Sequence, residues 1–210
     1  MTYGLQVVTA PGSRPLSAAE VASYVKAYTG EDEHLESLID QAVEEVARYT
    51  GRALISATYR LVQSDWPRGL PEFASYPRNP LGPYLHTLEL PRCPVTAISS
   101  VKYYPADSDV LTTLSPSQYI AVTAYEPGMV YLREGYDWPA LSERPDAVQV
   151  EFTAGYANAA SLPRTMRQAL LLLCRYYYAG GSPDEQVGPA DDLEKAHHIL
   201  NNLKVSGWSA

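Results

Sequence analysis

Residues 35–61 read LESLIDQAVEEVARYTGRALISATYRL, and the spacing of the apolar side chains changes once within this stretch. Up to residue 47 they recur at the i, i+3, i+4, i+7 spacing of an amphipathic helix, and Gly51 is placed to end that helix in a left-handed conformation. From residue 53 onward apolar and polar side chains alternate, as in a strand with one solvated face. A helix that leads directly into a strand predicts a fold containing both.

The chain before this stretch predicts one shorter helix. SAAE (17–20) has the form of a capping box, in which the Ser17 hydroxyl accepts a hydrogen bond from a first-turn amide and Glu20 reaches back to the cap. We expect the helix to run to about Tyr28, where Thr29 and Gly30 interrupt it.

The middle of the chain predicts a small β module. Strand candidates follow at 85–90, 97–104, 118–124, 129–133 and 147–153. EPG (126–128) predicts a hairpin turn between the strands 118–124 and 129–133, because proline presets the first corner and glycine permits a positive φ. The proline-rich span 66–83 cannot be helical.

Two further helices are expected at the end of the chain, over 163–179 and 191–204, with a polar linker at 184–189 between them. The predicted fold class is therefore α+β, with a helical bundle formed by the N- and C-terminal helices and a small antiparallel β module inserted between them. The predicted parts are an N-terminal helical part (1–52), the β module (53–160) and the C-terminal helices (161–210).

Composition restricts the class of protein. The chain has 210 residues, of which 46% are hydrophobic and 19% charged, so it can bury a core. Its formal net charge of -8 argues against a free-standing binder of nucleic acid or of an anionic membrane. Residues 1–15 lack the pattern of a signal peptide, and no apolar run approaches the roughly 20 residues of a membrane helix. We expect a protein that is synthesised in the cytoplasm and remains soluble, with Cys93 and Cys174 as reduced core residues.

The sequence offers little support for catalysis. It has no P-loop, no nucleophile elbow and no dinucleotide-binding fingerprint. The adjacent His197 and His198 point about 100° apart on a helix, so they cannot chelate one ion from one face. We therefore expect no enzyme, no metal site and no cofactor.

One face of the first long helix is acidic. Glu33, Glu36, Asp40 and Glu44 form a narrow stripe almost opposite the apolar face. In a monomer such a stripe is usually a solvated face. In a ring around DNA, the same stripe could line a channel that repels phosphate and so does not bind it.

The predicted helix over 163–179 is apolar on more than one face. Leu171, Cys174 and Tyr178 lie away from its main apolar face, among Arg164, Arg167 and Arg175. A helix of this kind is either a central core helix or one that packs inward on one side and against a neighbouring subunit on the other.

Aromatic usage supports a second class of protein. The chain has 17 tyrosines against two phenylalanines and three tryptophans. Such rings suit surfaces that are wet before assembly and buried after it, or surfaces that stack on sugars. A carbohydrate-binding module is therefore the alternative, with a stacking platform made of Tyr76, Tyr84, Tyr103, Tyr104 and Trp138.

The order of these elements, together with several phrases, resembles the head-tail connector family of long-tailed bacteriophages and gene-transfer particles, also called adaptor or head-completion proteins. The phrases are LSAAEV (16–21), YTGR (49–52), LPRCPV (90–95), PGMVYL (127–132), WP (138–139), VEFTAGY (150–156) and LP (162–163). Together they span most of residues 16–180.

The resemblance implies a non-enzymatic ring, commonly twelvefold, that docks below the portal protein in the virion and holds the tail-side stopper or tail-completion protein. Double-stranded DNA passes through such a ring without sequence recognition, and no membrane is involved. The resemblance places the C-terminal segment at the portal, and we assign the portal contact to His197, His198, Leu203 and Trp208. The long loop 66–83 and the linker 184–189 depart from the family pattern.

Overall fold

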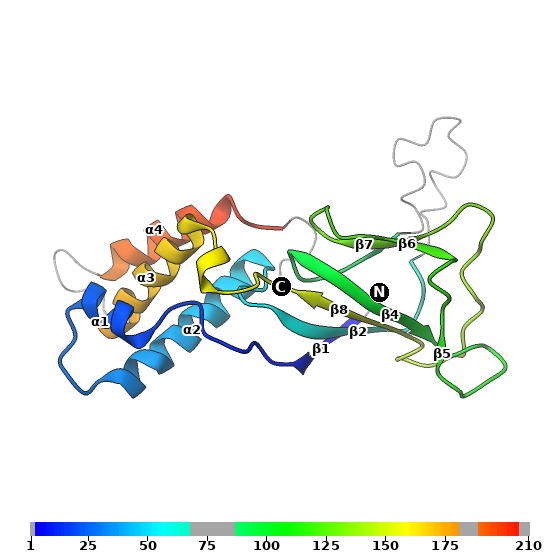
Figure 1. Cartoon of the computed structure of the whole chain (residues 1–210), viewed down its shortest axis with the longest axis horizontal. Coiled ribbons are helices and arrows are strands. Elements are labelled where there is room, and N and C mark those ends of the chain that lie inside the picture. The colour runs from blue at the N-terminus through cyan, green and yellow to red at the C-terminus, as the bar shows by residue number, and fades with distance from the viewer. Residues whose placement is uncertain (1–2, 68–86, 181–188, 206–210) are drawn as a thin grey trace. The chain divides into compact units, whose positions relative to one another are not determined.

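The structure is a computed structural model that describes residues 3–67, 87–180 and 189–205 (Figure 1). It contains helices and antiparallel sheets, so the predicted α+β class is confirmed. Contacts divide the chain into two units. The helical unit comprises residues 11–56 and 155–210, and the sheet unit comprises residues 1–10 and 57–154. None of the helices described is long and apolar enough to cross a membrane.

Four α-helices form the helical unit: α1 (Ala18–Val25), α2 (Asp32–Thr50), α3 (Arg164–Tyr178) and α4 (Pro189–Asn201). Ser17 caps α1 as predicted, since its Oγ accepts a hydrogen bond from the backbone N–H of Glu20 at 3.2 Å. Gly51 ends α2 with φ of 73°, also as predicted. The last helix begins at Pro189 instead of Asp191.

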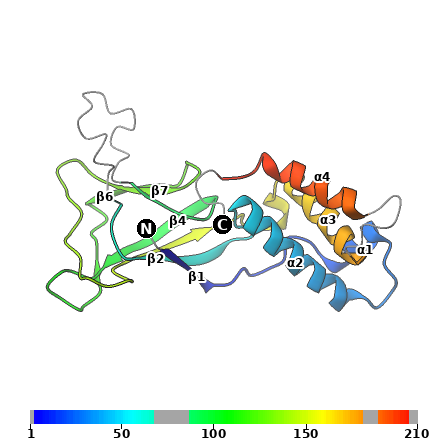
Figure 2. The same ribbon diagram turned by 180° about the vertical axis from the view of Figure 1, so that it is seen from behind.

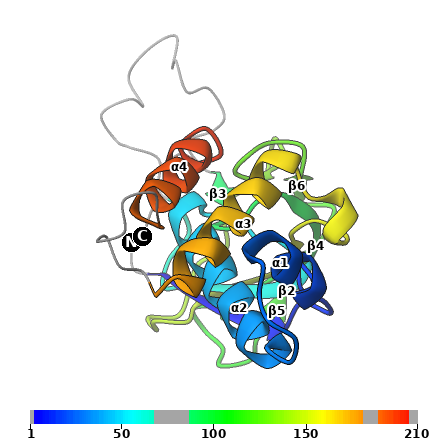
Figure 3. The same ribbon diagram turned by 90° about the vertical axis from the view of Figure 1, so that its left-hand side faces the viewer.

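The helix α3 lies at the centre of the helical unit. It packs against α1, α2 and α4, and Figure 3 shows it between α4 on one side and α1 and α2 on the other. The fully buried large side chains of this unit are Val21, Leu35, Ile39, Val46, Met166, Leu170, Leu173 and Leu200. The core cluster around these side chains includes no residue of the sheet unit, so the helical unit has its own hydrophobic core.

The sheet unit contains two antiparallel sheets. The five-stranded sheet has the order β1-β2-β8-β4-β5, and the three-stranded sheet has the order β3-β7-β6. The strands are β1 (Tyr3–Thr9), β2 (Ala57–Gln63), β3 (Leu88–Glu89), β4 (Val95–Tyr103), β5 (Thr112–Thr113), β6 (Tyr119–Val122), β7 (Met129–Leu132) and β8 (Val148–Ala154).

The strand β8 is the centre of the larger sheet. Every second residue along it is buried, which is the alternation that the sequence predicts, and it pairs with β2 on one side and β4 on the other. Phe152 lies opposite Tyr59 on β2, and their rings stack with centroids 5.7 Å apart. The strand β1, which was not among the predicted strands, adds to the far side of β2 as an edge strand (Figure 2).

The predicted hairpin between β6 and β7 is present, but the reason given for its glycine is wrong. Gly128 does not have a positive φ. A Cβ at this position would lie 2.6 Å from Cγ2 of Val95, and the carbonyl oxygen of Gly128 accepts a hydrogen bond from the N–H of Leu90. Glycine is therefore required here by the close approach of the turn to neighbouring chain segments.

The chain passes between the two units at three points, and two of them, after Ser56 and before Gly155, lie side by side in the helical unit. Ile55 pairs with Tyr156 in a parallel bridge, and the N–H of Ser56 donates to the carbonyl oxygen of Tyr156 at 2.8 Å. Gly155 has φ of +113°, and a Cβ there would lie 2.4 Å from the carbonyl oxygen of Ile55. Backbone meets backbone at this point with no space for a side chain.

Candidate functional site

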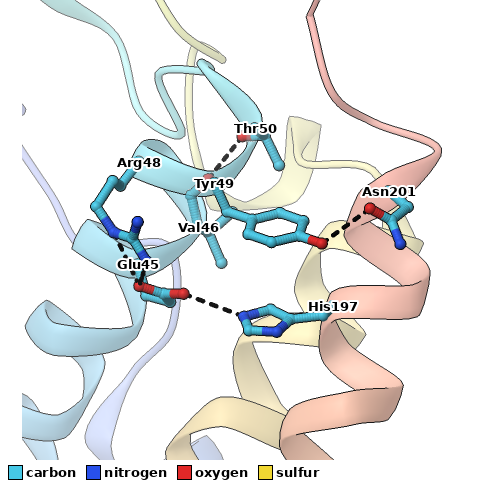
Figure 4. A network of polar contacts seen from close by, with 7 residues as sticks. All are labelled: Glu45, Val46, Arg48, Tyr49, Thr50, His197 and Asn201. Carbon is cyan, nitrogen blue, oxygen red and sulfur yellow. Dashed lines mark hydrogen bonds and ion pairs between the residues drawn. The ribbon is translucent and has the colours of Figure 1, made fainter. Parts of the chain in front are cut away.

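A polar network joins the C-terminal turn of α2 to α4, and Figure 4 shows it from close by. The His197 ring stacks on Tyr49 with centroids 4.5 Å apart and parallel planes, and its Nε2 lies 3.1 Å from Oε1 of Glu45. The Tyr49 hydroxyl donates to Oδ1 of Asn201 at 2.8 Å. We call these four residues the C-terminal clamp, because they hold α4 against α2.

Glu45 is the charged centre of the clamp. Its side chain is only 16% exposed, and burial acts to raise the pKa of this carboxyl. Hydrogen bonds from Arg48 and His197 outweigh burial, so the pKa of Glu45 lies below its ordinary value. The carboxylate therefore remains ionised between two partners, one on its own helix and one on α4.

The chain that follows α4 is also fixed to the end of α2. Arg52 donates from Nε to the carbonyl oxygen of Leu203 at 2.7 Å, and the N–H of Val205 donates to the carbonyl oxygen of Thr50 at 2.9 Å. The Lys204 ammonium lies 3.9 Å from the Tyr49 ring centroid, which is cation–π geometry. The position and direction of the chain are therefore defined as far as residue 205.

The structure places the predicted portal residues in different environments. His197 is held inside the clamp, whereas its neighbour His198 is exposed. Leu203 is half-buried, and its carbonyl oxygen is used by Arg52. Trp208 lies outside the described residues.

A groove runs between α3 and α4 beside the clamp and has a volume of about 630 Å³. Both histidines line it, although their rings leave the helix in different directions. Leu172 and Ile199 supply apolar lining, and Lys195 is among the charged residues at the groove. The groove gives α4 a concave surface of mixed polarity beside the clamp.

The predicted acidic stripe on α2 is interrupted by an arginine from outside the helix. Arg14 donates to both carboxylate oxygens of Asp40, at 2.8 and 2.9 Å, and to Glu36 at 3.0 Å. The Arg14 hydrogen bond lowers the pKa of Asp40. Glu33 and Glu44 remain exposed at either end of the stripe. Helix periodicity cannot predict this contact, because Arg14 and Asp40 are separated by 26 residues in the sequence.

Most of the predicted subunit-interface residues on α3 have partners within the chain. Arg167 forms a two-pronged ion pair with Glu20, and Arg175 does the same with the buried Asp192 of α4. The Tyr178 hydroxyl donates to Glu31 at 2.8 Å. Leu171 is half-buried and packs against the core, and Arg164 is exposed.

The pairing of Arg167 also corrects the prediction for the start of α1. Glu20 was expected to complete a capping box by reaching back to the cap. Its carboxylate instead accepts both hydrogen bonds from Arg167, at 2.9 and 2.5 Å, and this ties α1 to α3. The capping serine does not need that glutamate, since its own hydroxyl already binds the first-turn amide.

The aromatic residues proposed as a sugar platform are engaged with one another. Trp138 stacks on Trp66 with centroids 4.2 Å apart, and the buried Trp66 donates from Nε1 to the carbonyl oxygen of Pro139 at 2.9 Å. Tyr103 is tilted against Trp66, and the Arg144 guanidinium covers Tyr104 at 3.6 Å. The predicted Tyr76 and Tyr84 lie outside the described residues. No observation therefore favours the carbohydrate-binding alternative.

The cysteines have the environment that the sequence predicts. Cys93 and Cys174 are both buried and neither is part of a disulfide, and burial raises the pKa of the Cys174 thiol to about 12. Within the described residues there is no group of three or more side chains suited to hold a metal ion.

Comparison with known proteins finds no matching family model and no match among curated proteins. Solved structures do match. A chain in the neck of an empty gene transfer agent (GTA) particle, computed with C6 symmetry, aligns with a TM-score of 0.71 and 23% identity over 96% of this chain and 95% of that chain. A chain in the virion of the native GTA particle aligns with a TM-score of 0.70 and 23% identity over the same shares. A third, in the neck of the native particle computed with C12 symmetry, aligns with a TM-score of 0.70 and 21% identity over the same shares. This chain therefore has the fold of chains found in GTA particles, including their necks.

Proposed function

We propose that this protein is a head-tail connector, a structural virion protein whose subunits form a ring below the portal and let double-stranded DNA pass through. The observation that carries the proposal is the length of the fold match, because 96% of this chain aligns with 95% of a neck chain and both units are therefore included. The C12 symmetry of one matched neck supports a ring of subunits. In this proposal the ring lies at the head-tail junction of the virion, and its partner on the tail side is a stopper or tail-completion protein.

The C-terminal clamp supports a portal contact near the end of α4. His197 is occupied by Glu45 and Tyr49, so it positions the helix, while the exposed His198 and the adjacent groove remain accessible. The contact extends through Leu203 into the tail that contains Trp208. The clamp defines where that tail begins, which reduces the entropy lost on docking.

Fewer residues of the acidic stripe are proposed to face the DNA channel. Arg14 pairs with both Glu36 and Asp40 and offsets one of their two negative charges, so most of the repulsive charge of the stripe is carried by the exposed Glu33 and Glu44. Replacing these two residues with lysine leaves the Arg14 pairs intact. In rings it should create salt-sensitive binding of DNA, because added cations release counterions from phosphate. Unchanged DNA binding and unchanged genome ejection would contradict the channel assignment and would indicate that the stripe is a solvated outer face.

Fewer of the predicted residues on α3 are proposed to contact a neighbouring subunit. Of the five predicted interface residues, Arg167, Arg175 and Tyr178 have partners within the chain, which leaves the exposed Arg164 and the half-buried Leu171 to contact a neighbouring subunit. Arg164→Glu should weaken ring formation without loss of helix content. Intact rings from this variant would place the contact elsewhere.

Electron microscopy of the purified chain mixed with its portal rings tests the proposal. The full chain should appear as a ring beneath the portal, and a chain that ends at Val205 should fold but dock poorly. This truncation is preferred to removal of the whole of α4, because α4 supplies the fully buried Ala196 and Leu200. Failure of the full chain to bind the portal contradicts the proposed function, whereas equal docking by both chains moves the contact away from the tail.

A further inference from the structure

The edge strand β1 exposes apolar side chains along the border of the larger sheet. Val7 is 60% exposed and Tyr3 is 45% exposed, although both lie on the same face as the partly buried Leu5. Leu5 pairs with the fully buried Leu61, so this face continues that of the core. On its outer side β1 has no neighbouring strand among the described residues.

The other sheet edges in the described part of the chain are poor partners for a strand of this length. The far edge of the same sheet is formed by β5, which has two residues, and β4 behind it has two register shifts along its pairing with β8. The three-stranded sheet ends in β3 and β6, with two and four residues. Short edges and bulges are features that prevent strand addition. The edge of β1 lacks both protections over residues 3–7, since its irregularity begins only after Val7.

The sequence of β1 is complementary to itself. In an antiparallel pair centred on Leu5, that residue faces its own copy, and Tyr3 of each strand faces Val7 of the other. All of these side chains lie on one face, because they are two residues apart. Pairs of aromatic and β-branched side chains are among the favourable cross-strand pairs.

The charge of the strand also permits self-pairing. The whole chain has a net charge of -8, yet YGLQVVT contains no charged side chain. Two acidic molecules can therefore meet along β1 without placing like charges in register. A charged edge residue, which is a common device against such pairing, is missing.

We propose that β1 is a self-association strand, through which two copies of this chain pair antiparallel about Leu5 and join their five-stranded sheets. Such a contact uses the same surface on both molecules and closes after two subunits. A cyclic ring needs head-to-tail contacts, so a ring of this chain has to be built through a surface other than the β1 contact. That last consequence rests on the proposed function, whereas the dimer itself does not.

Light scattering with size-exclusion chromatography over a wide dilution series tests the dimer. The wild-type chain should change from dimer to monomer on dilution. Val7→Lys should weaken dimerisation by at least about tenfold, because it places a cation within the apolar row. The matched control is Val110→Lys, which makes the same change at a side chain that is 69% exposed outside any strand, and it should dimerise like the wild type.

Cross-linking tests the register. Leu5→Cys places two thiols opposite each other, within the Cα separation that a disulfide spans, so mild oxidation should give a covalent dimer. In Thr9→Cys the two thiols are displaced by eight residues in this register, roughly 26 Å at 3.3 Å per residue, and should not cross-link. The native cysteines are buried and do not compete. A chain that is monomeric at every concentration overturns the proposal, as does equal cross-linking of the two variants. Neither result depends on portal binding, so this proposal can fail separately from the proposed function.

Discussion

The helical unit and the strand β1 differ in how they use charge. In the helical unit, arginines and acids from different segments are paired with each other, as Arg175 is with Asp192 and Arg167 with Glu20. The strand β1 has no charge and exposes apolar side chains at an edge that has no neighbouring strand in the described part of the chain. An uncharged apolar edge can add a strand from a second copy, whereas paired charges hold the helices of one chain together, so the proposed self-association is expected at β1 and stability is expected to depend on the helices.

The strongest test of this contrast is a core substitution in α3. Leu173→Ala should lower the free energy of unfolding by about 2 to 5 kcal/mol, because Leu173 is fully buried and its truncation leaves a cavity. Chemical denaturation monitored by circular dichroism measures the loss. Leu171→Ala is the matched control on the same helix and should cost less, since Leu171 is only half-buried. Equal losses would contradict the division of α3 into core and outer faces.

The next largest effect is expected at the ion pair between α3 and α4. Arg175→Ala leaves the carboxylate of Asp192, whose side chain is 3% exposed, without its partner, and should cost about 1 to 3 kcal/mol. Arg14→Ala is the comparison, because its partners Glu36 and Asp40 are exposed and can be solvated by water; its loss should be smaller. Thermal unfolding of the two variants in parallel distinguishes them, and a larger loss for Arg14→Ala would contradict the ranking.

A smaller effect is expected in the clamp. Tyr49→Phe removes the hydroxyl that donates to Asn201 but keeps the ring beneath His197, so it should cost about 0.5 to 1.5 kcal/mol. Hydrogen exchange of the α4 amides should increase in this variant. Tyr28→Phe, at a side chain that is 81% exposed, should leave both stability and exchange unchanged. Neither variant should alter self-association through β1.

The smallest effect concerns acid. Because the pKa of Glu45 is lower in the folded chain than its ordinary value of 4.5, this residue stabilises the fold above that pH, and the contribution is lost as the pH falls through the lowered pKa. Glu45→Gln should therefore flatten the dependence of stability on pH in this acidic range. The exposed Glu44→Gln is the control and should keep the wild-type profile. Identical profiles for both variants would show that the clamp does not depend on the charge of Glu45.

Local patterns were sufficient to predict most of the helices and strands. The i, i+3, i+4, i+7 spacing and Gly51 defined α2, and alternation defined β8, since both signals lie within a few residues. The strand β1 was missed because its pattern is irregular and its pairing with β2 joins Tyr3 to Gln63, far away in the sequence. Gly128 was correctly predicted as a turn residue. Glycine is needed there because Val95 leaves no space for a side chain, and only the folded chain brings Val95 close.

The candidate site residues show more clearly that local sequence patterns cannot reveal contacts between distant parts of the chain. Helical geometry placed four acids on one face of α2, but it could not show that Arg14 covers two of them. The residue spacing of α3 was compatible both with a core helix and with a helix at a subunit interface. It could not show that Arg167 and Arg175 form ion pairs, because their partners lie in α1 and α4. His197 and His198 are equivalent in sequence, yet Glu45 and Tyr49 hold only the first. Tertiary partners therefore decide which side chains remain accessible.

The close backbone contact at Gly155 has a consequence for how such proteins diversify. Because the chain leaves and re-enters the helical unit at adjacent points, Ile55 and Tyr156, the segment between them behaves as a cassette whose ends already meet. A gene that exchanges this cassette, together with the strand β1 that pairs with it, for another with closely spaced ends leaves the helical core unchanged. The position that has to be retained in every such exchange is a glycine, since any side chain at residue 155 would push the two entry points apart.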